Sequence, residues 1–154
     1  MPDTALVKVE DAVAALLRAK TELDDWEIET DPDSSINSEA PKRILVTNGG
    51  FTVDQSDCLG QSIHRTVLEL AFMSGPQPLG IINRANGEAI AHAHAAIAAD
   101  RYLNDMLQSL EERDVQSVAD ELRDVHAATL QYDVEYYTPR DDWFTIIGQG
   151  GETF

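Results

Sequence analysis

The chain has 154 residues, of which 43% are hydrophobic and 25% charged, so it is long enough to fold as one domain with its own core. Its longest unbroken apolar run is six residues. A membrane-spanning helix needs about 20, so no membrane association is expected. The first residues lack the basic and apolar regions of a secretory signal, and none is predicted. A single cysteine, Cys58, excludes an intramolecular disulfide and a zinc cluster built on cysteines.

The strongest compositional feature is the charge. Twenty-eight acidic residues against eleven basic ones give a formal net charge of −17, and both halves of the chain are acidic. Such a surface repels phosphate, which excludes sequence-independent binding of nucleic acid through a basic face. Acidic, Asp-rich and Lys-poor proteins are typical of a salt-rich cytoplasm, where molar salt screens charges beyond about 3 Å. The alternative is an ordinary acidic protein whose charge only prevents aggregation.

The first half of the chain predicts one helix followed by strands. Apolar residues at helical spacing predict a helix over residues 4–20, and strict alternation predicts a strand over 26–30. A polar, proline-bounded loop is expected at 31–41. The Asn48-Gly49-Gly50 sequence lies between two apolar runs and predicts a hairpin turn, because Asn-Gly tolerates positive φ at both turn positions. A bulged three-residue turn is the alternative.

The second half predicts a long strand, a long helix and a final strand. The stretch 111–126 is ambiguous, because its apolar spacing fits a helix while a short strand is also possible. Otherwise the patterns predict, in order, a strand over 63–73, a loop over 74–80, a helix within 83–110 capped by Asn86, a strand over 128–136 and a closing strand over 143–147.

This order of elements predicts an α+β fold. We expect a single domain over residues 1–147, built as a mostly antiparallel β-sheet of four to five strands packed against two main α-helices. Residues 148–154 are expected to form a flexible C-terminal tail.

A search for catalytic chemistry yields no candidate. No glycine-rich phosphate loop or nucleophile elbow is present. Cys58 lies close to two aspartates, and negative charge raises a thiol's pKa and lowers its reactivity. His92 and His94 are two apart, so on a helix they point in different directions and cannot share a metal. We therefore predict no catalytic residue, no cofactor and no metal, and expect that the protein is not an enzyme.

Aromatic residues gather near the end of the chain, and two interpretations are open. At alternate strand positions such residues usually belong to the core, but tyrosine and tryptophan are also enriched in protein interfaces. The members are Tyr132, Tyr136, Tyr137, Trp143 and Phe144.

The segment from Ala128 to Asp142, ATLQYDVEYYTPRDD, resembles the closing strand and turn of the tail terminator (tail completion) proteins of long-tailed bacteriophages and archaeal tailed viruses. The predicted element order resembles that family as well. A departure is the stretch 111–126, which is more charged than the family pattern.

The resemblance implies a structural virion protein that catalyses nothing. Six copies would form a ring that caps the head-proximal end of the tail tube, ends tube polymerisation and joins the tail to the head-completion or neck protein. Viral DNA would pass through the channel without specific binding. The protein would be assembled in the host cytoplasm and reside at the head–tail junction of the virion. The expected interaction residues are Asp31, Asp33, Asn48, Asp54, Tyr137, Asp141, Asp142 and Trp143.

Two other classes of function remain open. One is a head–tail connector or neck protein of the same virion, and the other is a small salt-adapted ligand-binding or enzymatic domain. In the ring hypothesis, the loop at 31–41 and the Asn48–Gly50 segment lie at ring surfaces, so deleting residues 34–38 is expected to weaken assembly without unfolding the chain.

Overall fold

The computed structural model describes residues 3–30, 42–55, 60–74, 79–120 and 125–154, and every structural statement below concerns these residues. The loop predicted at 31–41, which contains Asp31 and Asp33, lies outside them, and so does Cys58.

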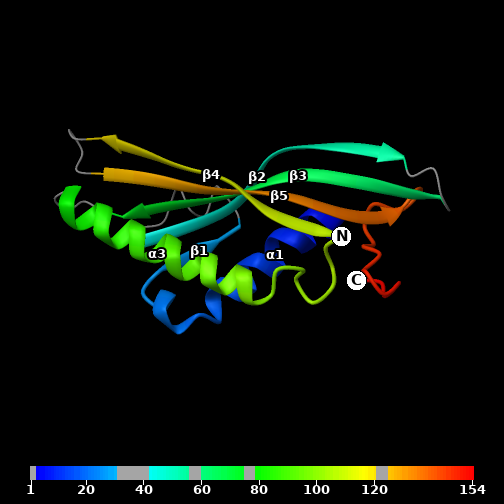
Figure 1. Ribbon diagram of the computed structural model, residues 1–154, viewed down its shortest axis with the longest axis horizontal. Helices are drawn as coiled ribbons and strands as arrows, with labels where there is room; N and C mark the ends of the chain where they lie inside the picture. Colours follow the sequence, from blue (N-terminus) through cyan, green and yellow to red (C-terminus); the bar gives the residue numbers. More distant parts are fainter. Residues whose placement is uncertain (1–2, 31–41, 56–59, 75–78, 121–124) are drawn as a thin grey trace.

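A five-stranded sheet forms the centre of the molecule (Figure 1). Its strand order is β1-β2-β3-β5-β4; β1 is parallel to β2 and the other pairs are antiparallel. The predicted α+β class and mostly antiparallel sheet are therefore confirmed. The strands are β1 (Glu27–Glu29), β2 (Lys42–Gln55), β3 (Gln61–Ser74), β4 (Ser109–Asp120) and β5 (Val125–Pro139).

Two helices, α1 (Ala5–Arg18) and α3 (Leu79–Ala99), lie on the same side of this sheet (Figure 1). Thr4 caps α1, since its hydroxyl accepts a hydrogen bond from the Val7 amide at 3.4 Å. A short 3-10 helix, η1 (Thr21–Leu23), leads from α1 to β1. α1 packs on β2, while α3 packs on β3 and β5, and the two helices contact each other.

Strict alternation along β3 and β5 gives the sheet two different faces. The even-numbered residues of β3, and those of β5 from Ala128 to Thr138, point toward the helices and are buried, which defines the helix-covered face. The odd-numbered residues lie on the other face, here called the open face, which no helix of the described residues covers (Figure 1). The core on the covered face includes Leu68, Leu70, Phe72, Leu130, Tyr132, Val134 and Tyr136.

The predicted hairpin at Asn48–Gly50 is wrong, and the bulged-turn alternative is also wrong. β2 runs through this segment as one strand, and both of its halves pair with β3. The extra residues form a β-bulge, in which Gly50 adopts a φ of +125° that other residues rarely take. The Asn48 amide donates to the carboxyl of Glu10, a buried acid on α1, at 3.0 Å. The Asn-Gly sequence therefore marks a β-bulge, next to which the Asn48 side chain contacts Glu10 of α1.

The predicted helix within 83–110 is correct only up to Ala99, and it starts earlier, at Leu79. Asn86 lies inside the helix and accepts a hydrogen bond from Ser74 at 2.8 Å, so it is not the cap. After the helix, Leu103, Asn104 and Asp105 all take positive φ, a conformation that stops helical growth.

Within the ambiguous stretch 111–126, residues 111–120 belong to β4 (Ser109–Asp120) and residues 125–126 to β5, while residues 121–124 lie outside the described ranges. A bulge between Glu112 and Asp114 shifts the alternation of β4 by one residue. The closing strand predicted at 143–147 is wrong: residues 143–145 form a turn, and Ile147 alone makes isolated bridges, to Tyr137 and Thr153.

Candidate functional site

Three of the eight predicted interaction residues, Asp141, Asp142 and Trp143, lie in the turn after β5, here called the aromatic turn (residues 140–145). Asp142 organises it: its carboxylate accepts hydrogen bonds from the Phe144 amide at 2.9 Å and the Thr145 hydroxyl at 2.7 Å. These bonds, that from Thr145 first, lower the pKa of Asp142. The carboxylate thereby fixes the turn in the same way as an Asx turn.

The aromatic turn is held against the start of α1. The Ala5 amide donates to the Trp143 carbonyl at 2.9 Å, and the Lys8 ammonium donates to the Phe144 carbonyl at 2.5 Å. Even so, Trp143 and Phe144 keep 45% and 43% of their surface exposed. The backbone is fixed while two large aromatic side chains face solvent.

His64 of β3 lies beneath the turn and is 3% exposed. Its ring stacks on Tyr136 at 4.8 Å, meets Trp143 edge-on at 5.2 Å, and shares a 2.8 Å hydrogen bond between Nε2 and the Thr138 hydroxyl. Burial lowers the pKa of His64. A neutral imidazole therefore connects the turn to the two central strands.

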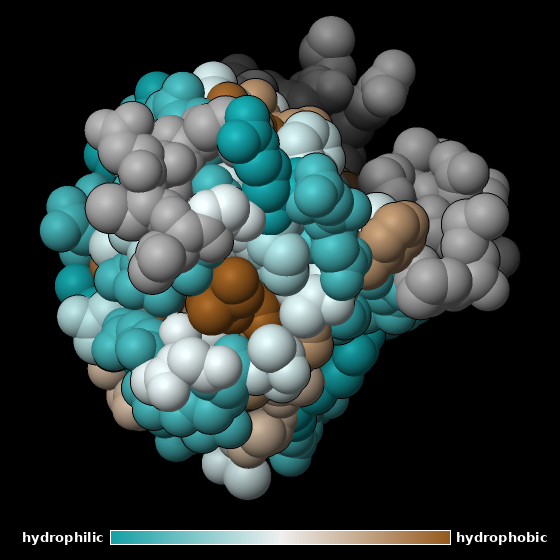
Figure 2. Space-filling view, turned by 90° about the vertical axis from the view of Figure 1, so that its right-hand side faces the viewer, coloured by the Kyte–Doolittle hydropathy of each residue, from teal (hydrophilic) through white to brown (hydrophobic). Residues whose placement is uncertain are grey.

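Figure 2 looks onto the end of the molecule to which β2 and β5 run. The most hydrophobic surface in this view is a small area near its centre, surrounded by polar and neutral residues, with further apolar spots toward the edges. A small apolar area of this kind is normal on the surface of a soluble protein.

Residues 146–154 return along the sheet and the start of α1. The Ile147 amide donates to the Tyr137 carbonyl at 2.8 Å, and the Gln149 amide donates to the Asp105 carbonyl at 2.9 Å. Phe154 packs against the core, and its carbonyl accepts from Lys8 at 3.0 Å. The flexibility predicted for residues 148–154 stays a prediction, since hydrogen bonds alone do not measure motion.

A groove opens between α3 and β4 at the far edge of the sheet. It has a volume of about 480 Å³ and is mainly apolar, with Ile90 and Ala91 on the helix side, Leu130 at its base and Val115 on the strand side. Val115 is 56% exposed. Sequence analysis missed this residue, because its position relative to the helices depends on the bulge in β4.

The rim of this groove is held by polar contacts between α3 and the sheet. His94 Nδ1 lies 2.8 Å from the Tyr132 hydroxyl, and the two rings are stacked with centroids 6.2 Å apart. Burial raises the pKa of Tyr132, which keeps the hydroxyl neutral. Arg101 forms an ion pair with Glu112 of β4. His94 is thus a structural contact, and within the described ranges no group of three metal-ligating side chains occurs.

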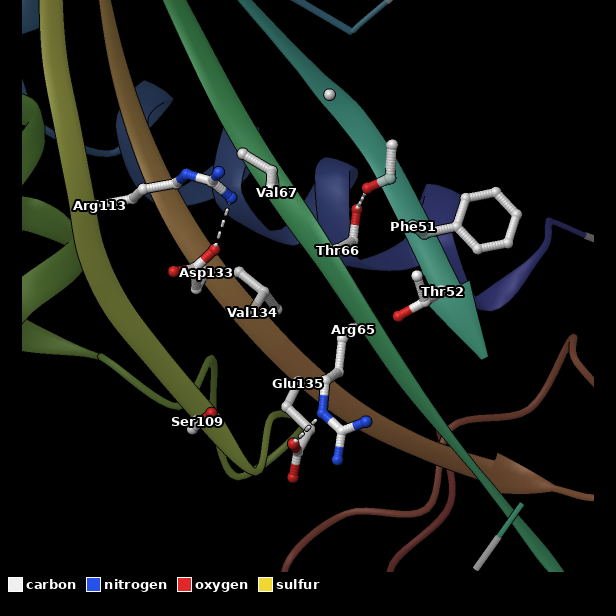
Figure 3. A pocket seen from close by; sticks show the side chains of 12 residues that line it. Phe51, Thr52, Arg65, Thr66, Val67, Ser109, Arg113, Asp133, Val134 and Glu135 are labelled. Carbon is white, nitrogen blue, oxygen red and sulfur yellow. Dashed lines mark hydrogen bonds and ion pairs between the residues drawn. The ribbon is translucent and has the colours of Figure 1, made fainter. Parts of the chain in front are cut away.

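The open face carries cross-strand ion pairs around a shallow hollow of about 630 Å³ (Figure 3). Arg65 on β3 pairs with Asp54 on β2 and, at 3.1 Å, with Glu135 on β5. Arg113 at the β4 bulge pairs with Asp133 at 3.2 Å. Figure 3 shows the Arg65–Glu135 and Arg113–Asp133 pairs over the open face. Opposite charges alternate here, so the face offers no concentrated charge to a ligand.

The structure separates the predicted interaction residues into three groups. Asp141, Asp142 and Trp143 lie together in the aromatic turn, and Tyr137 is linked to it through Ile147. Asp54 belongs to the ion pairs of the open face. Asn48 contacts Glu10 and is not part of either surface.

No protein-family model matches the chain, and no curated protein matches it. A solved structure described as "Virion of native gene transfer agent (GTA) particle" matches 86% of this chain and 98% of its own, with 16% identity and a TM-score of 0.49. A similarity at this level does not define the role of this chain. No helix among the described residues is long and apolar enough to cross a membrane.

Proposed function

We propose that this chain is a structural subunit of a tailed virus particle, a tail terminator that assembles as a ring, with six copies expected. The proposal rests on the sequence pattern at 128–142. That pattern coincides with the end of β5 and the aromatic turn, so the residues that resemble the family are those that fix Trp143 at the surface.

In the proposed role the ring caps the head-proximal end of the tail tube and joins it to the neck of the head. Each subunit contributes binding surface and no reaction. Heterologous contacts, in which different surfaces of neighbouring copies meet, close into a ring when the rotation between copies fits. A net charge of −17 per copy suits a channel through which DNA slides without binding.

The function is tested with the full chain and the tail tube protein encoded in the same genome. Tube protein alone is expected to polymerise into tubes of variable length. Adding the chain in equimolar amounts is expected to shorten them, with density for the chain at one end in electron micrographs. Tubes of unchanged length with bare ends would contradict the terminator role, whereas binding to neck protein only would favour the connector alternative.

A further inference from the structure

The turn that follows α3 has a strained backbone. Leu103, Asn104 and Asp105 take φ values of +49°, +57° and +66°, which places three consecutive residues in the left-handed region. Asparagine and aspartate tolerate this region, but a bulky side chain such as that of Leu103 is rarely found there. Left-handed residues normally occur singly, because their Cβ lies too close to the following carbonyl oxygen. Such strain persists only where the surrounding structure holds it in place.

The sequence of this turn favours a different conformation. Residues 100–107 follow directly on α3, which ends at Ala99, and they contain neither glycine nor proline. Half of them are good helix formers, namely Arg101, Leu103, Met106 and Leu107. Local propensity therefore favours a longer α3, whereas the tertiary structure imposes a left-handed turn. A segment with such a conflict is suited to switch between two conformations.

The C-terminal segment, residues 146–154, contacts this turn and is here called the latch. Its first residue, Ile146, is fully buried and fixes the latch to the core. Gln149 then reaches the turn twice. Its backbone amide donates to the Asp105 carbonyl at 2.9 Å, and its side-chain amide donates to the Leu107 carbonyl at 2.9 Å. Two hydrogen bonds from one latch residue thus hold the carbonyl groups of the strained segment.

Gly148 allows the latch to approach the turn this closely. A Cβ at this position would lie 2.8 Å from the Asp105 carbonyl oxygen and 2.7 Å from the Phe154 ring, and real Cβ atoms do not come so close to other heavy atoms. The carbonyl belongs to the backbone, so it cannot rotate away as the end of a flexible side chain can. Any side chain at position 148 must therefore push the latch and the turn apart.

We propose that the latch and the left-handed turn form a two-state device. With the latch in place, residues 103–105 are left-handed and β4 starts with Ser109 paired to Glu135, as in the structure. When the latch is displaced, α3 lengthens through residues 100–107 and the start of β4 loses its pairing with β5. Ser109 and Glu135 both line the hollow of the open face, so this surface then changes shape. The change occurs within one subunit and does not depend on ring formation.

Two matched glycine variants of the full chain test the latch. Gly148→Ala is expected to displace it, to speed amide hydrogen exchange of residues 104–110 at least about tenfold, and to move the NMR chemical shifts of residues 100–107 toward helical values. Gly150→Ala is the control in the same segment, because its new Cβ meets only the flexible end of the Glu152 side chain, and it should exchange as the parent chain does. Unchanged exchange in Gly148→Ala, an equal rise in both variants, or faster exchange without helical shifts overturns the inference.

A second pair, Asp105→Gly and Asp105→Ala, tests the turn and leaves the latch sequence intact, so it decides the question even if Gly148→Ala does not fold. Both variants remove the same exposed carboxylate. Glycine favours the left-handed turn, whereas alanine favours the helix. We therefore expect the Tm of Asp105→Gly to be about 2–4 °C above that of Asp105→Ala, and Asp105→Ala to show the faster exchange at residues 104–110. Equal Tm values, or a higher Tm for Asp105→Ala, would contradict the inference.

Discussion

The two faces of the sheet are built from the same two strands, yet one face is buried and the other is exposed. The even-numbered residues of β3, and those of β5 from Ala128 to Thr138, are buried under α1 and α3, whereas odd-numbered neighbours such as Arg65 and Glu135 form ion pairs on the open face. A residue such as Leu68 is fully buried, and the adjacent Val67 is not. The period of two therefore separates the residues that stabilise the chain from those that are free to change without loss of fold.

The largest effect is expected from a direct comparison of neighbours on opposite faces. Leu68→Ala removes a fully buried side chain and should lower the free energy of unfolding by about 2–5 kcal/mol. Val67→Ala, one residue away on the open face, should cost less than about 1 kcal/mol. Urea denaturation measures both. Equal losses would show that the open face is covered in solution.

The dependence of Tm on salt should reveal the effect of the net charge, which salt screens, as distinct from that of the local ion pairs. Because each chain carries −17, we expect the Tm to rise between dilute buffer and molar KCl, by about 2–4 °C for each kcal/mol of relieved repulsion. Thermal melts in both buffers provide the measurement. An unchanged Tm would remove the argument for adaptation to a salt-rich cytoplasm.

Acidic pH should lower the stability of the fold, because His64 is buried on the helix-covered face. Its pKa is lowered by burial, so the unfolded chain binds a proton more readily than the folded chain, and stability falls as the pH drops below about 6.5. His64→Phe keeps the ring stack but cannot take a proton. We expect the stability of the parent chain, relative to this variant, to decrease between pH 7 and pH 5. Parallel curves for the two proteins would contradict a neutral buried imidazole.

The open-face ion pairs should contribute least to stability. Arg65→Met breaks the pairs with Asp54 and Glu135, whose groups are solvent-exposed to a large extent, so a loss of about 0–1 kcal/mol is expected. The loss should shrink further in molar KCl. A loss above about 2 kcal/mol, measured by urea denaturation in dilute buffer, would mean that this face is buried by a partner.

The sequence determined the elements more reliably than their junctions. Alternation along residues 63–73 and 128–136 correctly predicted β3 and β5, and apolar spacing correctly predicted α1. It was wrong at Asn48–Gly50, where a β-bulge stands in place of a turn, and it left 111–126 open between helix and strand, where β4 contains a second β-bulge. A bulge changes the spacing by one residue, and whether a glycine pair turns or bulges depends on which strand pairs beside it. That pairing is a long-range property.

The aromatic turn and the α3/β4 groove also differ in how far the sequence predicts them. The aromatic turn could be anticipated, because Asp141, Asp142 and Trp143 are adjacent in the sequence. The α3/β4 groove could not, because it joins Ile90 on a helix to Val115 on a strand 25 positions later. Local signals identify a side chain that stands out, whereas a concave site needs the tertiary arrangement of segments that are distant in the chain.

The most direct test of ring formation is the mass of the full chain in molar KCl, measured by light scattering with and without tail tube protein. The proposed ring predicts a discrete species whose mass is a small multiple of 17.0 kDa, six copies being expected, in at least one of the two samples. A chain that remains a 17.0 kDa monomer in both samples would contradict the account.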